Sequence, residues 1–112
     1  MTTYDDAKLV VGLLQWGAQI KLNEAVSDLF SEDFDPEAAS ANDDSVRSVL
    51  SFGEILGTFV KRGVLDGEFA HDLFAIQLLW RKVGSAALKS RADAGEPRLW
   101  ENFEALEKTA PA

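Results

Sequence analysis

The chain has 112 residues, of which 46% are hydrophobic and 10% aromatic, enough to bury one core and too much for intrinsic disorder. It contains no cysteine, which excludes disulfides, thiolate metal sites and cysteine nucleophiles and suits a reducing cytoplasm. The formal net charge of −8 disfavours binding to the phosphate backbone of a nucleic acid. We therefore expect one domain over residues 1–112 that binds no nucleic acid.

The first predicted helix runs from about Thr3–Asp6 to Phe30, because small polar and acidic residues suit a helix N-terminus. Gln15, Gln19 and Lys21 interrupt its apolar run, and acids rather than bases precede it. The segment is therefore expected to be neither a membrane-spanning helix nor a signal peptide. We expect a soluble, cytoplasmic protein without a membrane segment.

Apolar residues of this helix fall into two sets at steps of three and four, which is the spacing of one helical face. The second set is shifted in register from the first, and we expect both to be buried. One set is available to be covered by a second subunit. The sets are Leu9, Leu13, Trp16 and Ile20, and then Leu22, Val26, Leu29 and Phe30.

The stretch SEDFDPEAASANDDS interrupts the helical spacing, and Pro36 with six acids between Glu32 and Asp44 predicts a long connection. The chain up to Asp44 holds ten acids and two lysines, so this part carries the whole net negative charge. Two interpretations are open: a solvated loop that keeps the protein soluble, or a docking surface for a basic partner. The candidate partner-binding residues are Glu32, Asp33, Phe34, Asp35, Glu37, Asp43 and Asp44.

The second predicted helix begins at Asn42 or Asp43 and ends at Gly63, which can adopt the left-handed conformation of a helix C-terminus. Gly53 and Gly57 lie four residues apart within it, a spacing that lets another helix approach closely. Phe52 and Ile55 widen its apolar inner face, so this helix is expected to lie centrally in the fold.

Two further helices complete the prediction. Asp66 is placed to cap a third helix that runs to about Ala92, and a last short helix spans Pro97 to about Lys108. No alternating pattern indicates a strand. The chain is therefore predicted to be all-α, a bundle of four main helices with a long acidic connection between the first and the second.

The only histidine, His71, stands three residues after Glu68, a spacing with which helical bundles hold two metal ions. A second such motif cannot exist in a chain with one histidine, and a zinc site would lack ligands. We therefore expect no metal, and the neighbouring acids are interpreted as stabilising the start of a helix. Phe69 and Leu73 are expected to point into the core and His71 to face solvent.

No catalytic pattern accompanies this histidine, since the chain has no G-x-S-x-G elbow, no P-loop and no G-x-G-x-x-G. We expect a protein that is not an enzyme and holds no cofactor. The alternative is a small-molecule-binding or enzymatic bundle, because tryptophans beside a cavity can hold an apolar ligand. Its pocket would be lined by Trp16, Trp80 and Trp100.

Three stretches follow one another in a distinctive order: FVKRGVLD, DLFAIQLLW and GEPRLWENFEAL. Over roughly residues 46–106 this order resembles a widespread bacterial family described only as a domain of unknown function. The resemblance implies a mostly helical fold, no established activity and no catalytic residues to transfer. Some members carry an N-terminal membrane segment, for which the equivalent region here is too short and too polar. The matching positions are Gly63, Asp66, Trp80, Pro97 and Phe103.

These patterns predict a small cytoplasmic helical protein that is non-enzymatic and acts through protein–protein contacts. Its partner is expected to be a second copy, bound through apolar faces left on the first and second helices, or a basic protein bound at the acidic segment.

Overall fold

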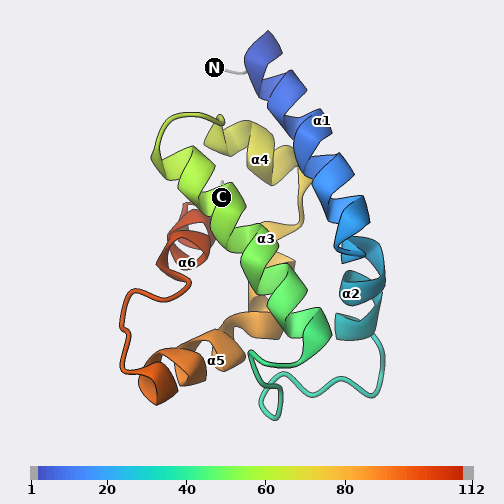
Figure 1. The fold of residues 1–112 in the computed structure, drawn as a ribbon, viewed down its shortest axis with the longest axis vertical. Helices are drawn as coiled ribbons and strands as arrows, with labels where there is room; N and C mark the ends of the chain where they lie inside the picture. Colours follow the sequence, from blue (N-terminus) through green and yellow to red (C-terminus); the bar gives the residue numbers. More distant parts are fainter. Residues whose placement is uncertain (1–2, 110–112) are drawn as a thin grey trace.

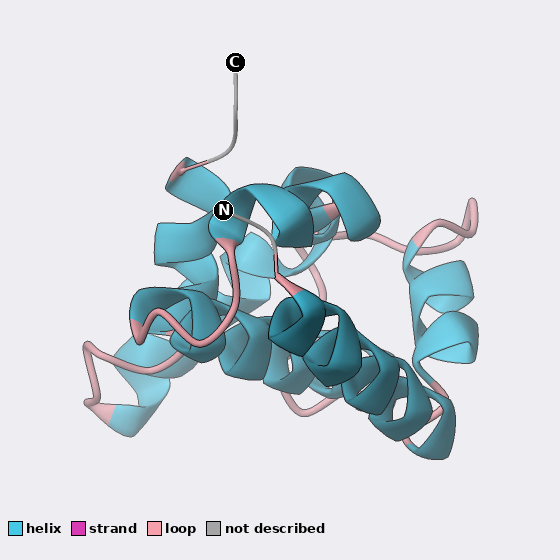
Figure 2. Ribbon diagram, turned by 90° about the horizontal axis from the view of Figure 1, so that it is seen from above, coloured by secondary structure: helices cyan, strands magenta, loops and turns pink. Residues whose placement is uncertain are grey.

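The computed structural model describes residues 3–109, and every regular element in that range is a helix (Figure 1), which confirms the all-α prediction. Residues 1–2 and 110–112, which the domain prediction includes, lie outside the described residues. Figure 2 shows the same helices from above, joined by loops. Two of the four predicted helices are interrupted, so the described part holds six: α1 (Tyr4–Gln19), α2 (Leu22–Leu29), α3 (Asp44–Lys61), α4 (Gly67–Leu73), α5 (Ile76–Ala94) and α6 (Glu101–Lys108).

Helix α1 starts where the sequence predicted, and a reciprocal pair of hydrogen bonds fixes its first turn. The Asp6 amide donates to Thr3 Oγ1 (3.1 Å) and the Thr3 amide donates to Asp6 Oδ2 (2.7 Å), which is a capping box. The Asp66 amide, just before α4, donates to Asp6 Oδ1 (3.0 Å), so one buried carboxylate ties two helix N-termini together. These backbone hydrogen bonds, led by that from Asp66, hold the pKa of Asp6 below its ordinary value of 3.8.

The predicted first helix is not continuous, because the chain turns sharply at Lys21. Lys21 adopts the left-handed conformation with φ 56°, and α2 then starts in a new direction (Figure 1). In a straight helix Leu22 and Leu29 would lie on the opposite side from Leu13, whereas the turn packs α2 against α3. Phe30, predicted to be buried, is 47% exposed at the end of α2. The second set of apolar residues is therefore shifted in register from the first because α2 runs in a different direction from α1.

Helix α3 lies at the centre of the fold, and α6 packs closely against it. Gly53 and Gly57 make this approach possible, as their spacing predicted. A Cβ atom on Gly53 would lie 2.3 Å from the Phe103 ring, and one on Gly57 would lie 2.2 Å from the Asn102 carbonyl oxygen. The position of α6 therefore requires both glycines.

A polar network beside these glycines caps the N-terminus of α6. Glu54 Oε1 accepts hydrogen bonds from the amides of Asn102 (2.9 Å) and Phe103 (3.0 Å), two of the groups that the start of a helix leaves without partners. The Asn102 side chain donates to Thr58 Oγ1 (2.9 Å), and Thr58 donates to the Glu54 carbonyl (2.7 Å). The cap of α6 thus comes from α3.

The third predicted helix is divided into α4 and α5 at Phe74, whose backbone is extended (φ −122°, ψ 137°). The Phe74 ring packs against Phe52 of α3, with ring centroids 5.3 Å apart, and this contact stabilises the interruption. Asp66 caps α4 as predicted and accepts a hydrogen bond from the Phe69 amide (3.2 Å). Leu73, predicted to face the core, is 48% exposed, because the interruption directs Phe74 inward in its place.

Gly63 ends α3 in the left-handed conformation, as predicted, with φ 73°, and Gly95 ends α5 in the same conformation, with φ 64°. The last helix begins later than predicted. Residues 97–100 form turns and α6 starts at Glu101, because Trp100 is itself left-handed (φ 63°). Arg98 donates to Glu101 (2.8 Å), and this hydrogen bond holds the pKa of Glu101 below its ordinary value of 4.5.

The hydrophobic core lies between α3 and the helices that surround it. Side chains from all six described helices and from the loops before α3 and α4 contribute to it. The largest fully buried side chains are Phe103, Leu29, Leu50, Leu56, Leu65 and Ile76.

Candidate functional site

The acidic segment, residues 32–44, connects α2 to α3 through a series of turns and is docked on α5. Ser85 of α5 donates to Glu37 Oε1 (3.0 Å). The Lys89 ammonium, one turn further along α5, donates to the Glu37 carbonyl oxygen. These contacts hold the middle of the segment against the body of the protein.

The seven residues predicted to bind a partner differ in their availability. Asp35 and Asp43 accept hydrogen bonds from amides within the segment (3.0 and 2.9 Å), and Phe34 packs against the core instead of standing free among the charges. Three carboxylates are exposed and have no hydrogen bond or ion pair within residues 3–109: those of Glu32, Asp33 and Asp44.

The three tryptophans lie in separate surroundings. Trp16 of α1 stacks on Phe52 with centroids 5.5 Å apart, and Trp80 of α5 meets the edge of Phe103 at 5.1 Å. Trp100, just before α6, lines a cavity to which Trp16 and Trp80 do not contribute. The three rings therefore do not share one pocket, and Trp100 is the one that lines this cavity.

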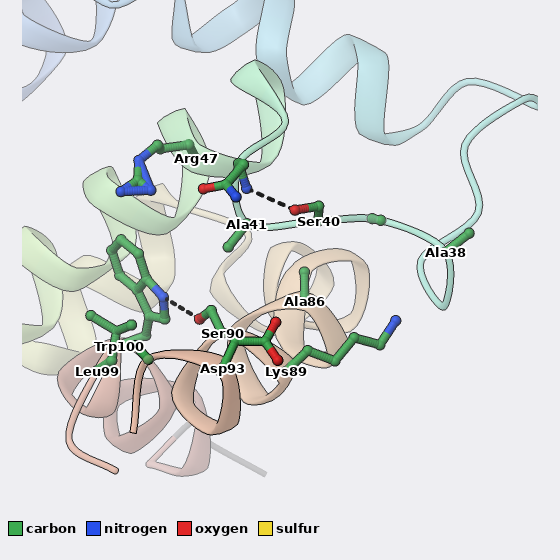
Figure 3. Close-up of a pocket in the computed structure, with 13 residues that line it drawn as sticks. Ala38, Ser40, Ala41, Arg47, Ala86, Lys89, Ser90, Asp93, Leu99 and Trp100 are labelled. Atoms are coloured by element: carbon green, nitrogen blue, oxygen red, sulfur yellow. Dashed lines mark hydrogen bonds between the residues drawn. The ribbon is translucent and has the colours of Figure 1, made fainter. Parts of the chain in front are cut away.

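This cavity has a volume of about 610 Å³ and lies between the acidic segment and α5 (Figure 3). Its size is within the usual range of small-molecule sites. Trp100 Nε1 donates to Ser90 Oγ (3.0 Å), which fixes the indole ring in the wall. The space is open because several lining side chains are only methyl groups: Ala38, Ala39, Ala41, Ala86 and Ala94.

Opposite charges line the cavity. Arg47 reaches it from α3 and Asp93 from α5 (Figure 3), and neither side chain makes a hydrogen bond or ion pair within residues 3–109. Lys89 also lines the cavity, with its ammonium bound to the Glu37 carbonyl. Charges of both signs beside the Trp100 ring are an arrangement that can hold a small polar ligand.

His71 is half-buried, contrary to the prediction that it faces solvent. Its Nε2 donates to the Leu106 carbonyl oxygen (2.9 Å), because α6 ends beside α4. Glu68, three residues earlier, is exposed. Within residues 3–109 no three or more His, Asp or Glu side chains are grouped so as to hold a metal ion. The histidine therefore serves the contact between α4 and α6.

A family model described as a domain of unknown function (DUF4760) matches residues 5–109. The chain belongs to this family. The match confirms the resemblance predicted from residues 46–106 and extends it to α1, α2 and the acidic segment. No curated protein and no solved structure matches the chain. Among the described helices of this DUF4760 protein, none combines the length and the apolar character needed to cross a bilayer.

Helix α1 of this DUF4760 protein is apolar around most of its circumference. One face, which includes Val10 and Leu13, is buried in the core. A second face, which includes Leu9 and Trp16, forms an apolar groove of about 290 Å³ with Ile55 of α3. A third apolar face is exposed, although a helix on a protein surface is ordinarily polar on the side away from the core.

The third face, here called the outer stripe, consists of five apolar residues at alternating steps of three and four along α1. Tyr4 is 77% exposed, Val11 55% and Leu14 57%. Steps of three and four in alternation are the spacing of a coiled-coil seam. The prediction took one apolar face of this helix, from Leu9 to Ile20, and drew its second set from residues that lie in α2. It therefore missed the third face, which the same spacing test would have found. The outer stripe comprises Tyr4, Ala7, Val11, Leu14 and Ala18.

Proposed function

We propose that this DUF4760 protein is a non-enzymatic cytoplasmic protein that acts through protein–protein contacts, with the outer stripe of α1 as its contact surface. The observation that carries the proposal is the exposure of Tyr4, Val11 and Leu14 along one side of a single helix. Contiguous apolar surface of this kind is typical of an interaction site.

Burial of the outer stripe would supply useful but limited binding free energy. Removing Tyr4, Val11 and Leu14 from water contributes on the order of 1 to 2 kcal/mol for each side chain. Association itself costs about 4 kcal/mol or more. The stripe is therefore suited to anchor a reversible contact, to which a partner adds its own apolar side chains.

The acidic segment favours a basic region on any partner that reaches it. The carboxylates of Glu32, Asp33 and Asp44 are exposed and unpaired within the described residues. Their field attracts basic side chains over about one Debye length, roughly 8 Å at physiological salt. Such attraction raises the rate of encounter more than it raises the affinity.

The proposal is tested by placing a photo-crosslinking amino acid at Val11 of the full-length protein in living cells. We expect irradiation to produce covalent adducts from position 11, because a bound partner covers the outer stripe. Gln19 is the matched control, since it is also exposed on α1 but belongs to the polar side of the helix, away from the outer stripe. Adducts that are absent, or equally abundant from both positions, would contradict the proposal.

The cavity beside Trp100 favours a second candidate function, the binding of a small molecule. Its volume suits a small ligand, and Arg47 and Asp93, which have no partner among residues 3–109, suit one with both charged and apolar groups. A bound ligand is expected to change the fluorescence of Trp100, and Trp100→Phe should abolish the change while Trp16 and Trp80 still emit. A panel of small zwitterionic and aromatic compounds that leaves the emission unchanged would count against this function.

A further inference from the structure

We infer that the partner of the outer stripe is the same stripe on a second copy of this chain, paired antiparallel about a two-fold axis near Val11. The inference rests on the proposed function, because it names the partner of that contact surface. A symmetric dimer needs a self-complementary surface, in which residues on one side of the axis fit those on the other.

The outer stripe meets this requirement by the sizes of its side chains. With Val11 on the axis and the two helices antiparallel, Tyr4 faces Ala18 of the second copy and Leu14 faces Ala7 of the second copy. Each large side chain then lies opposite a small one, which allows close packing. In a parallel pair every residue would face its own copy, so the tyrosines would collide and the alanines would leave gaps. The pattern therefore favours the antiparallel arrangement.

A hollow lies on the surface where the Tyr4 ring of the second copy would arrive. It has a volume of about 90 Å³ and is lined in part by Leu14, Gly17 and Ala18. Within residues 3–109 the Tyr4 ring is largely in solvent, and the Lys8 ammonium lies 5.5 Å from its centre. Tyrosine is among the residues that most often anchor protein interfaces by filling a pocket. The free ring and the hollow are thus complementary across the axis.

The distribution of charge also favours the antiparallel pair. Figure 1 shows the start of α1 and the acidic segment at opposite ends of the long axis of the molecule. Antiparallel pairing about Val11 places the two acidic segments at opposite ends of the dimer, whereas parallel pairing would bring them to the same end, where they repel. Along the seam Lys8 lies near Gln15 of the second copy, so no like charges meet.

The length of the seam sets the expected affinity. The 16 residues of α1 extend about 24 Å, so the pair buries less than the roughly 800 Å² per partner of a standard interface. We therefore expect a dissociation constant on the order of micromolar or weaker. The dimer should be populated in concentrated solution and dissociate on dilution.

The chain has no cysteine, so single cysteines introduced into the full-length protein test the pairing directly. Under mild oxidation at a protein concentration on the order of 100 μM, Val11→Cys is expected to form a disulfide-linked dimer by itself, because both thiols lie at the axis. Ala7→Cys and Leu14→Cys should crosslink only when the two variants are mixed. Gln19→Cys, on the polar side of α1, is the control for random collision.

Two other patterns would overturn the inference. Leu14→Cys that crosslinks with itself as readily as Val11→Cys would show a parallel pair. Crosslinking of Val11→Cys no greater than that of Gln19→Cys would show that a second copy does not bind the stripe. If photo-crosslinking at Val11 nevertheless captures a different protein, the proposed function stands and the second copy is the wrong partner.

Sedimentation equilibrium of the wild-type protein gives an independent readout. The dimer fraction is expected to rise with concentration and to vanish in Val11→Glu, which places a charge at the axis. Because Val11 is exposed in the monomer, this variant should keep its helix content by circular dichroism. A wild-type protein that remains monomeric at millimolar concentration, or a Val11→Glu variant that still forms the dimer, would overturn the inference.

Discussion

Replacing Gly57 with alanine is expected to lower the free energy of unfolding by about 3 kcal/mol. The added Cβ would lie 2.2 Å from the carbonyl oxygen of Asn102 and 2.5 Å from its carbonyl carbon. Backbone atoms of α6 cannot swing aside as a flexible side chain does, so α6 has to move away from α3. The higher helix propensity of alanine returns at most about 1 kcal/mol. Urea unfolding should show a lower midpoint with an unchanged slope.

Gly12→Ala is the matched control for this variant. It makes the same change within a helix, at a position where the new Cβ meets no atom within 4 Å. We expect it to raise the free energy of unfolding by about 0.5 to 1 kcal/mol through helix propensity alone. If Gly57→Ala also stabilised the protein, the close approach of α6 to α3 would not exist in solution.

Glu54→Ala is expected to lower the free energy of unfolding by about 2 to 3 kcal/mol. The Glu54 carboxylate accepts hydrogen bonds from the amides of Asn102 and Phe103, and truncation leaves both amides without an acceptor beside a packed helix interface. Urea unfolding measures the loss. The start of α6 should also exchange its amide hydrogens faster than in the wild type.

Glu54→Gln separates the hydrogen bonds from the charge. Its side-chain oxygen can still accept, while the favourable interaction of a negative charge with the helix N-terminus is lost, so we expect a smaller decrease of about 1 kcal/mol. Equal losses for Glu54→Ala and Glu54→Gln would mean that the charge, and not the acceptor, stabilises α6. A Glu54→Ala variant as stable as the wild type would show that water replaces the cap.

The sequence predicted well those positions at which one residue type decides the local backbone. Gly63 adopts the left-handed conformation expected of it, because glycine lacks the Cβ that makes this conformation costly. Thr3 and Asp66 cap α1 and α4, because their side-chain oxygens reach amides only three residues away. Such effects depend on residues that are close together in the sequence, so the sequence alone can predict them.

The helix interruptions were missed because they depend on packing between distant residues. Lys21 and Phe74 are compatible with a helix interior, and no glycine or proline marks either position. Their backbones leave the helical conformation where α2 and Phe74 pack against α3. The late start of α6 has the same origin, since Glu54 is remote from it in sequence.

The candidate sites also differ in whether they depend on local sequence or on packing between distant residues. The outer stripe is a property of one helix, so the spacing of Tyr4, Val11 and Leu14 would have been sufficient to predict it, although the prediction missed it. The cavity beside Trp100 depends on how Glu37 docks the acidic segment on α5, which no local pattern reveals. Helical spacing indicates which face of its own helix a tryptophan occupies, but not how far that face lies from a face of another helix. The sequence therefore could not show whether Trp16, Trp80 and Trp100 line one pocket.

The capping of α6 by Glu54 also bears on how the protein is made. An eight-residue helix such as α6 is too short to be stable alone in water. Residues 101–108 leave the ribosome after every other described helix, so the growing chain presents an uncovered α3 until they arrive. During that interval the surface around Gly53 and Gly57 is open to chaperones and to other nascent chains, so the chain is most exposed to misassembly before α6 has emerged.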